Sequence, residues 1–193
     1  AENGCDLQTT LDTTIQYYLE KGVQELEARF GTGKGATGIV MDVNTGAVLA
    51  MASLPTYDLN DPSAIYNDFL TAGMTEEEIV ENATDLRNKQ WRSKAINDTY
   101  EPGSTFKTLT LAMALEENVV DMNTSFYCGG NMTVEGQKIW CSKRTGHGQQ
   151  DLSTAFANSC NPAFMNIGIR IGNAKFYQYM KDFGLMEKTG IDT

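Results

Sequence analysis

The sequence predicts an α/β (α+β) fold in which a helical part accompanies a small antiparallel sheet. Three observations support this prediction. Apolar residues recur at helical spacing from residue 13 to residue 30, two short apolar runs flank a turn at residues 43–46, and helical patterns prevail between residues 104 and 182. A chain of 193 residues is long enough to bury one core but short for two domains.

The composition excludes several classes of function. Hydrophobic residues make up 41% and charged residues 21%, which is ordinary for a globular protein. The net charge of −10 repels a phosphate backbone, so we expect no nucleic-acid partner. The longest apolar run, residues 47–52, is far too short to cross a bilayer. We therefore expect a soluble chain, with any anchor or export signal outside it.

The first expected element is an amphipathic helix that begins near Asp12 or Thr13 and ends at Phe30. Asp and Thr are common helix N-caps, and the glycines from Gly31 onward end the apolar pattern. The glycine-rich stretch 31–35 has glycine where a phosphate loop needs Ser or Thr, and it follows a helix instead of a strand. We do not expect it to bind a nucleotide.

Residues 38–51 predict an antiparallel hairpin, because a turn containing Asn and Gly separates the two apolar runs. Residues 55–91 are polar and interrupted by prolines, and they predict one short helix at Thr75, where a capping box begins. A long excursion of this kind usually carries function or acts as a lid.

The second half of the chain is mostly helical. Residues 104–115 are almost wholly apolar after Lys107, which predicts a helix buried nearly all round. The remaining expected elements are a second hairpin and three helices, at residues 126–141, 152–159, 162–171 and 175–182.

Ser104 and Lys107 are the first candidate catalytic pair. They stand three residues apart at the start of a helix, so their side chains share one face. A serine hydroxyl becomes a good nucleophile when a base removes its proton, and a lysine is such a base when burial keeps it neutral. The alternative is an N-cap serine beside a solvated lysine, but Lys107 lies in an otherwise apolar helix, where an unpaired charge is costly.

Ser159 and Asn161, between two of the expected helices, form a second candidate pair. Their hydroxyl and carboxamide groups can relay a proton and hold a substrate amide, whereas helix capping is the alternative interpretation. His147 is the only histidine, and nothing near it resembles the turn that carries a nucleophile in Ser-His-Asp enzymes.

Cys128, Cys141, His147 and Asp151 form a candidate metal site. Two thiolates, an imidazole and a carboxylate would complete a tetrahedral zinc shell. Two alternatives stay open, namely a disulfide between Cys128 and Cys141 and a pair of ordinary reduced thiols. In each case the cluster would brace the loops near the serine and take no part in the chemistry, and Cys160 is interpreted as a buried core residue.

Two motifs resemble those of the class B penicillin-binding proteins. These are Glu101-Pro-Gly-Ser-Thr-Phe-Lys107, which contains Ser-x-x-Lys, and Ser159-Cys-Asn-Pro-Ala-Phe164. Other matching segments lie in the same order along the chain: Gln8–Gln16, Met41–Ser53, Ala95–Tyr100, Gly146–Gly148, Phe183–Gly184 and Thr189–Asp192.

The resemblance implies a partial β-lactamase/D,D-transpeptidase-like fold over residues 1–193, a helical subdomain with an incomplete antiparallel sheet. It also implies that Ser104 attacks the D-Ala-D-Ala carbonyl of a peptidoglycan stem peptide while Lys107 takes its proton. Ser159 would shuttle a proton to the leaving amine, and Asn161 would bind the substrate amide. β-Lactams would acylate Ser104, and the whole protein would act at the extracytoplasmic face of a bacterial membrane with other wall-synthesis proteins.

Lys188-Thr-Gly190 has the letters of the family's third motif, which sits on a sheet strand beside the nucleophile. It comes only 29 residues after Ser159 and near a glycine-ended helix, and its neighbours match an earlier family segment. We therefore expect the third motif and the C-terminal strands to be absent, and little or no turnover by this chain alone.

Two other functions remain open. A β-lactamase or penicillin-sensing receptor shares Ser-x-x-Lys, but no Glu-x-x-Leu-Asn pattern follows Ser159, which disfavours hydrolysis. A non-catalytic module that docks wall-synthesis proteins through residues 55–91 is the third hypothesis.

Overall fold

The computed structural model describes residues 4–31, 35–66 and 68–191. The stretch examined as a phosphate loop falls mostly outside these residues, as does the last residue of the Thr189–Asp192 segment. The chain divides into two units, residues 1–99 and 100–193, which are described separately. In the part of the chain that the structure describes, no helix is both long and apolar enough to cross a membrane.

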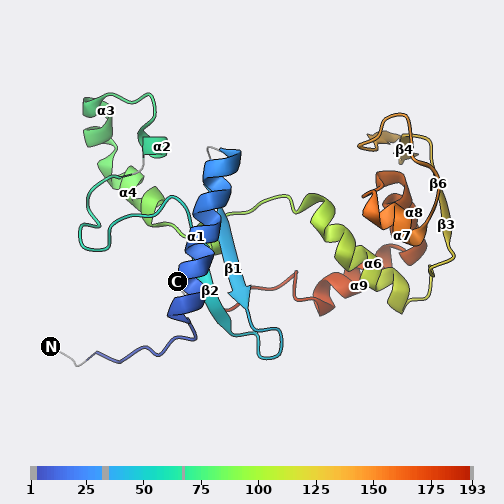
Figure 1. The fold of residues 1–193 in the computed structure, drawn as a ribbon, viewed down its shortest axis with the longest axis horizontal. Helices are drawn as coiled ribbons and strands as arrows, with labels where there is room; N and C mark the ends of the chain where they lie inside the picture. The colour runs from blue at the N-terminus through green and yellow to red at the C-terminus, as the bar shows by residue number, and fades with distance from the viewer. Residues whose placement is uncertain (1–3, 32–34, 67, 192–193) are drawn as a thin grey trace. The chain divides into compact units, whose positions relative to one another are not determined.

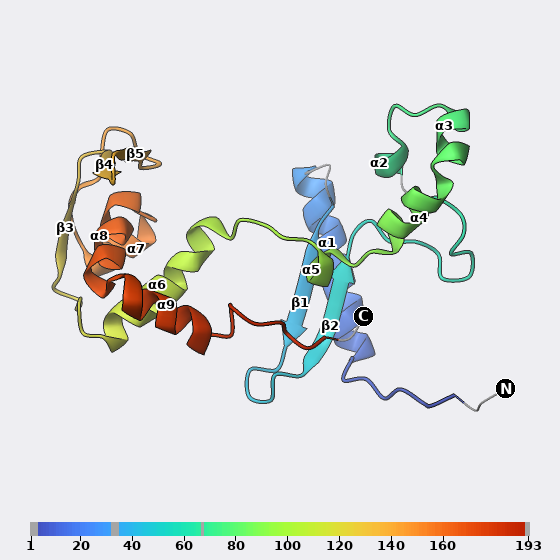
Figure 2. The same cartoon turned by 180° about the vertical axis from the view of Figure 1, so that it is seen from behind.

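The first unit is built on a helix packed against a hairpin. Helix α1 spans Thr13–Phe30, and the Asp12 side chain caps it by accepting from the backbone N–H groups of residues 14 and 15. Strands β1 (Thr37–Met41) and β2 (Val48–Ser53) are antiparallel, as expected. Figures 1 and 2 show α1 lying along this hairpin. The small core between them consists of Val23, Ala52 and Leu54, with Leu19 and Ala36 packed at its edge.

The polar excursion after the hairpin contains more helix than the sequence predicts. Helix α3 (Glu76–Glu81) begins with the expected Thr75 capping box, but α2 (Asp68–Thr71), α4 (Ala83–Trp91) and α5 (Lys94–Asn97) are additional. The buried Gln90 side chain fastens the loop to α4: it accepts from the Tyr66 N–H at 3.0 Å and donates to the Ala64 carbonyl at 2.9 Å.

The second unit contains four short strands in two pairs. Strands β4 (Asn131–Val134) and β5 (Gln137–Trp140) form a hairpin closed by Glu135 and Gly136, both in the left-handed conformation that a tight two-residue turn requires. Strand β3 (Ser125–Cys128) pairs instead with β6 (Gly148–Asp151). The single hairpin expected over residues 126–141 is thus half right, because its first strand has a partner from beyond Cys141.

Four helices complete this unit. A 3₁₀ turn, η1 (Gly103–Phe106), leads into α6 (Lys107–Glu116), and α7 (Leu152–Ala157), α8 (Asn161–Ile171) and α9 (Asn173–Asp182) follow the strands. Among the described residues, the largest fully buried side chains are Met113, Leu152, Ile167, Cys128 and Cys160. Three of the four cysteines therefore lie inside the core.

Helix α6 is not buried all round, contrary to the sequence expectation. Thr110, Met113 and Ala114 face the core, whereas Leu115 is 42% exposed. The reason is that α6 packs against α8 along one face, and its other apolar residues meet no comparable element among the described residues.

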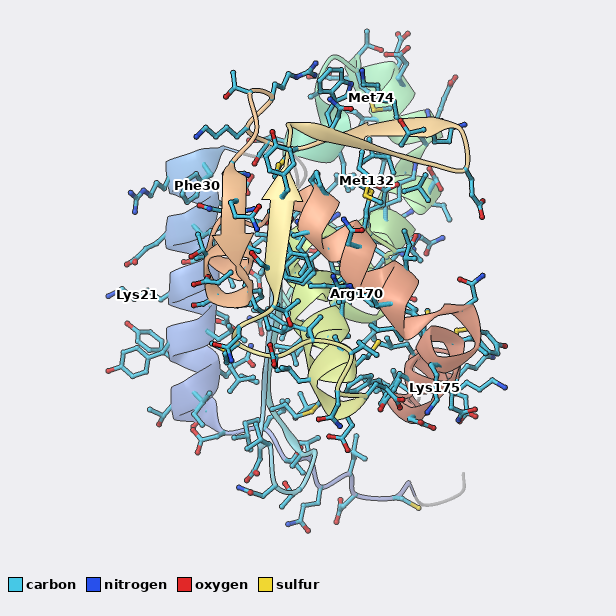
Figure 3. The ribbon with its side chains drawn as sticks, turned by 90° about the vertical axis from the view of Figure 1, so that its right-hand side faces the viewer. Lys21, Phe30, Met74, Met132, Arg170 and Lys175 are labelled. Carbon is cyan, nitrogen blue, oxygen red and sulfur yellow. The ribbon has the colours of Figure 1, made fainter. Side chains whose placement is uncertain are left out.

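Contacts at the surface of this unit hold α8 and α9 in place. Arg170 of α8 lies over the Phe126 ring at 5.3 Å, and Lys175 of α9 pairs with Glu117 at 2.8 Å (Figure 3). Hydrogen bonds from Lys175 and the Tyr179 hydroxyl hold the pKa of Glu117 below its usual value. Helix α9 is thereby tied to the end of α6.

Candidate active site and metal-binding cluster

Ser104 lies in the 3₁₀ turn η1, one turn before Lys107, and its side chain is exposed. It lines a cavity of about 510 Å³ together with Lys107 and Asn161. Phe164 and Phe176 supply apolar wall to the same cavity. The hydroxyl is therefore open to an approaching ligand, which a nucleophile requires.

The Lys107 side chain joins the two candidate pairs. Its Nζ lies 2.7 Å from the Ser159 carbonyl oxygen, 3.0 Å from Ser159 Oγ and 2.7 Å from Asn161 Oδ1. An ammonium group has three N–H donors, so these three oxygens use all of them. Among the described residues no hydrogen bond from Lys107 reaches Ser104, whose hydroxyl stands free beside the network.

The surroundings of Lys107 favour its neutral form. Burial in the cavity wall lowers the pKa of the amine below its usual value, and the electrostatic effect of the Cys141 and Cys160 sulfurs acts in the opposite direction. The amine also lies 5.4 Å from the centre of the Phe164 ring, a contact that favours the charged form. The net direction is downward, toward a lysine that can accept a proton.

Ser159 is held in an unusual backbone conformation. Its φ of +48° lies in the left-handed region, which residues other than glycine rarely adopt. The turn follows the end of α7, and it presents both the carbonyl and the hydroxyl of Ser159 to Lys107. Asn161 begins α8, and its Nδ2 donates to the Trp140 carbonyl at 2.8 Å, which fixes the amide so that Oδ1 faces Lys107. Strain of this kind is common at functional sites.

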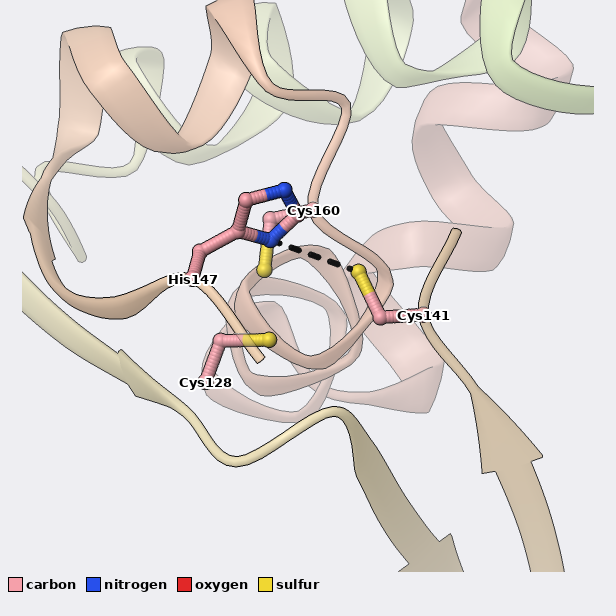
Figure 4. A group of neighbouring side chains, drawn as sticks. All are labelled: Cys128, Cys141, His147 and Cys160. Carbon is pink, nitrogen blue, oxygen red and sulfur yellow. Dashed lines mark hydrogen bonds between the residues drawn. The ribbon is translucent and has the colours of Figure 1, made fainter. Parts of the chain in front are cut away.

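A second cluster of side chains includes Cys160, the residue between Ser159 and Asn161. The sulfur atoms of Cys128, Cys141 and Cys160 and a ring nitrogen of His147 all lie within 4.8 Å of one another (Figure 4). The three cysteines are buried free thiols, and His147 Nδ1 lies 3.5 Å from the Cys141 sulfur. This arrangement could hold a metal ion.

The candidate metal ligands that the structure brings together differ from the expected set in a single member. Asp151 stands outside the cluster, since its carboxylate caps α7 by accepting from the Thr154 N–H at 2.7 Å. Cys160, expected to be a plain core residue, takes its place. The sequence does contain a signal for the capping role of Asp151. It stands directly before an expected helix, and an Asp in that position is a typical N-cap. No comparable local signal marks Cys160.

The chain converges on the cluster from four element ends. Cys128 ends β3, Cys141 follows β5, His147 precedes β6, and Cys160 lies between α7 and α8. Gly146 allows the chain before His147 to lie against the end of β3. Its φ is +84°, and a Cβ there would lie 2.2 Å from the Cys128 carbonyl oxygen.

Backbone donors surround the cluster's sulfurs. Burial raises the pKa of the Cys141 thiol, but N–H groups of Asn161 and Lys143 outweigh it, and the pKa lies below its usual value. Burial raises the pKa of Cys160 to about 11. Three thiols and an imidazole are the donors that zinc prefers. In a tetrahedral zinc shell of three sulfurs and one nitrogen, neighbouring donors lie roughly 3.5–3.8 Å apart, given Zn–S of about 2.3 Å and Zn–N of about 2.0 Å. The residues therefore fit the ion after a small contraction.

A Ser-x-x-Lys turn at the start of a core helix, bonded to a Ser-x-Asn loop, is the arrangement of active-site-serine penicillin-recognising proteins. Comparison with known families agrees: residues 36–193 match the family described as penicillin binding protein transpeptidase domain. The chain belongs to this family, and within it to the class B penicillin-binding proteins.

Individual relatives support the assignment. The chain is 36% identical to stage V sporulation protein D of Bacillus subtilis over 99% of its length, and 30% identical to peptidoglycan D,D-transpeptidase MrdA of Haemophilus influenzae over 98%. It spans about a quarter of each, 26% and 27%. The D,D-transpeptidase domain of an Eggerthella lenta peptidoglycan glycosyltransferase matches with a TM-score of 0.71 and 30% identity, covering 90% of this chain and 37% of that one. The fold class expected from the sequence is confirmed as a partial fold of this kind.

Proposed function

We propose that this chain is the N-terminal portion of a transpeptidase domain that cross-links peptidoglycan stem peptides through an acyl-serine intermediate. The observation that carries the proposal is the set of bonds from Lys107 Nζ to Ser159 and Asn161 beside the exposed Ser104 hydroxyl. One partly desolvated amine, the proposed proton acceptor, there contacts two other groups that acyl transfer needs: a relay hydroxyl and an amide-binding carboxamide.

The hydrogen bonds indicate how the proton moves. A neutral lysine keeps two N–H donors and one lone pair, and the two 2.7 Å contacts, to the Ser159 carbonyl and Asn161 Oδ1, occupy the donors. The lone pair is then left for a hydroxyl, either that of Ser104 or that of Ser159. Ser104 Oγ attacks the penultimate D-Ala carbonyl and its proton passes to Lys107.

Collapse of the tetrahedral intermediate breaks the peptide bond. The proton moves from Lys107 through Ser159 Oγ to the leaving nitrogen, and D-Ala departs with the bond electrons as a neutral amine. An amine of a neighbouring stem peptide then attacks the acyl-serine and restores the Ser104 hydroxyl. Asn161 would hold the substrate amide through its carboxamide. We place this reaction at the extracytoplasmic face of the bacterial membrane.

Mass spectrometry of the full-length protein after penicillin treatment tests this proposal. We expect one adduct, mapped to Ser104 and absent from Ser104→Ala. Rapid loss of the adduct in buffer would favour a β-lactamase or a hydrolytic relative. A Ser104→Ala protein that still supports growth would favour a non-catalytic module that docks through residues 55–91. For the 193-residue chain we expect little turnover, and robust acylation of it would contradict the proposed absence of part of the site.

We also propose that Cys128, Cys141, His147 and Cys160 hold a structural zinc ion. Four protein ligands close a tetrahedral shell and leave no position for substrate, so the ion would rigidify the loops and take no part in acyl transfer. Metal analysis of protein purified without added zinc should find one zinc per chain. Asp151→Asn should retain it and Cys160→Ala should lose it. An intact mass lower by two hydrogens, without zinc, would instead indicate a disulfide.

A further inference from the structure

Gln150 is a buried polar residue that neither candidate site accounts for. It lies on β6 opposite Phe126 of β3, with only 4% of its surface exposed. Its Oε1 accepts a hydrogen bond from Asn158 Nδ2 at 2.8 Å. This bond fixes the orientation of the amide, because Oε1 and Nε2 lie on opposite arms of the same planar group.

The other arm of this amide is unsatisfied. Gln150 Nε2 is fully buried and has no hydrogen-bond partner among the described residues. A buried N–H without an acceptor costs about 1–3 kcal/mol, and such groups are rare in folded proteins unless they serve an unseen partner.

The candidate acceptor for this donor is the sulfur of Cys160. This residue is fully buried and lies two residues after Asn158, the residue that binds Oε1 of the same amide. The Gln150 side chain and the Ala163 N–H also oppose the rise that burial causes in the pKa of Cys160, which agrees with an amide on that side of the sulfur. A neutral thiol is a weak acceptor, whereas a metal-bound thiolate is a strong one, so the donor gains a strong partner when the sulfur binds a metal ion.

We infer that Gln150 is a positioning residue of the metal site, whose Nε2–H donates to the Cys160 sulfur when that sulfur is a metal-bound thiolate. The inference rests on the proposed zinc site. Metal ligands are commonly oriented by such outer hydrogen bonds, and their loss weakens metal binding by about 10- to 100-fold.

The same side chain also connects the metal site to the loop that contacts Lys107. Its Oε1 binds Asn158, and the inferred bond from Nε2 to Cys160 would let Gln150 hold the residues on both sides of Ser159. The left-handed backbone of Ser159 lies between these two attachments. One amide thus spans the short segment that both sites share.

Titration of the full chain with zinc and with cobalt, in competition with a chromophoric chelator, tests the inference. Gln150→Glu keeps the shape of the side chain and replaces the donor with an oxygen. Gln149→Glu is the matched control, because the adjacent residue on β6 is exposed and carries the same chemical change. Gln150→Met is a second, uncharged variant that removes the donor should Gln150→Glu fail to fold.

We expect the Gln150 variants to bind zinc 10- to 100-fold more weakly than wild type and to shift the sulfur-to-cobalt charge-transfer band, with Gln149→Glu unchanged in both. The band reports the electron density on the sulfur, which a general loss of stability does not move. Equal affinity and an unshifted band in the Gln150 variants would overturn the inference and leave the zinc site standing. Failure of the wild type to bind either metal would overturn both.

Discussion

Two candidate sites share the tripeptide Ser159-Cys160-Asn161, and they differ in how far their side chains are exposed to solvent. The side chains of Ser159 and Asn161 bond to one partly exposed amine at the edge of an open cavity. The side chain between them is fully buried in a group of sulfurs. The first group of side chains leaves the Ser104 hydroxyl accessible, and the second is mostly buried.

The contrast indicates how a short loop can be both reactive and rigid. The two hydrogen bonds from Lys107 to Ser159 contribute about 0.5–3 kcal/mol each, which is the same size as the roughly 1–3 kcal/mol that a left-handed non-glycine residue costs. The buried side chain of Cys160, one residue away, adds a second constraint on the same loop.

Lys107→Met should have the largest effect. The variant removes the proton acceptor, so acylation of the full-length protein by a fluorescent penicillin should slow by about 10²- to 10⁴-fold. Lys175→Met is a suitable control, because Lys175 pairs with Glu117 at the surface of the same unit. Acylation of Lys107→Met at the wild-type rate would show that another group accepts the proton.

Cys160→Ala should act on stability more than on the lysine network. Loss of one ligand releases the ion, and at free zinc 100- to 1,000-fold above Kd the variant should unfold about 3–4 kcal/mol more easily than wild type. Denaturant titrations with and without a chelator measure this difference. Cys5→Ala is the control, since Cys5 is exposed and outside the cluster. If the chelator leaves wild-type stability unchanged, the ion has no structural role.

Gly146→Ala should cost less, about 1–3 kcal/mol, by straining the loop between Cys141 and His147. The added methyl meets the Cys128 carbonyl at 2.2 Å in a backbone conformation that alanine rarely adopts. Gly129→Ala is the matched control, because its Cβ would meet only the Tyr127 ring, at 3.5 Å. Thermal unfolding of both variants compares them, and equal melting temperatures would rule out a tight approach at this point.

Local patterns predicted the local structure well. Asp12 as the cap of α1, the Thr75 capping box and the β1–β2 hairpin depend on residues close in sequence, and the structure confirms each. Helix α4 was missed because its sequence is polar nearly throughout, and only Leu86 and Gln90 are buried.

Features that depend on distant residues were harder to predict. The pairing of β3 with β6 spans the intervening hairpin and places Cys128 opposite Gly148, the residue after His147. No periodicity in the sequence predicts that these segments meet, so Asp151 was expected in the cluster, where the structure has Cys160. The residues around Lys107 were found through short motifs, and their shared contact with one amine depends on a turn that the sequence alone does not specify.

The pH dependence of acylation is the finest test of the contrast between the two sites. Lys107 must be neutral to accept the Ser104 proton, so the rate should rise about tenfold per pH unit until its pKa is passed. Because burial lowers that pKa, the plateau should begin below the usual lysine value of 10.5. Initial acylation rates between pH 6 and 11.5, with circular dichroism at each pH to confirm folding, give the profile. A limb centred at the ordinary lysine value would mean that the cavity does not desolvate the amine, and that the open site owes its reactivity to geometry alone.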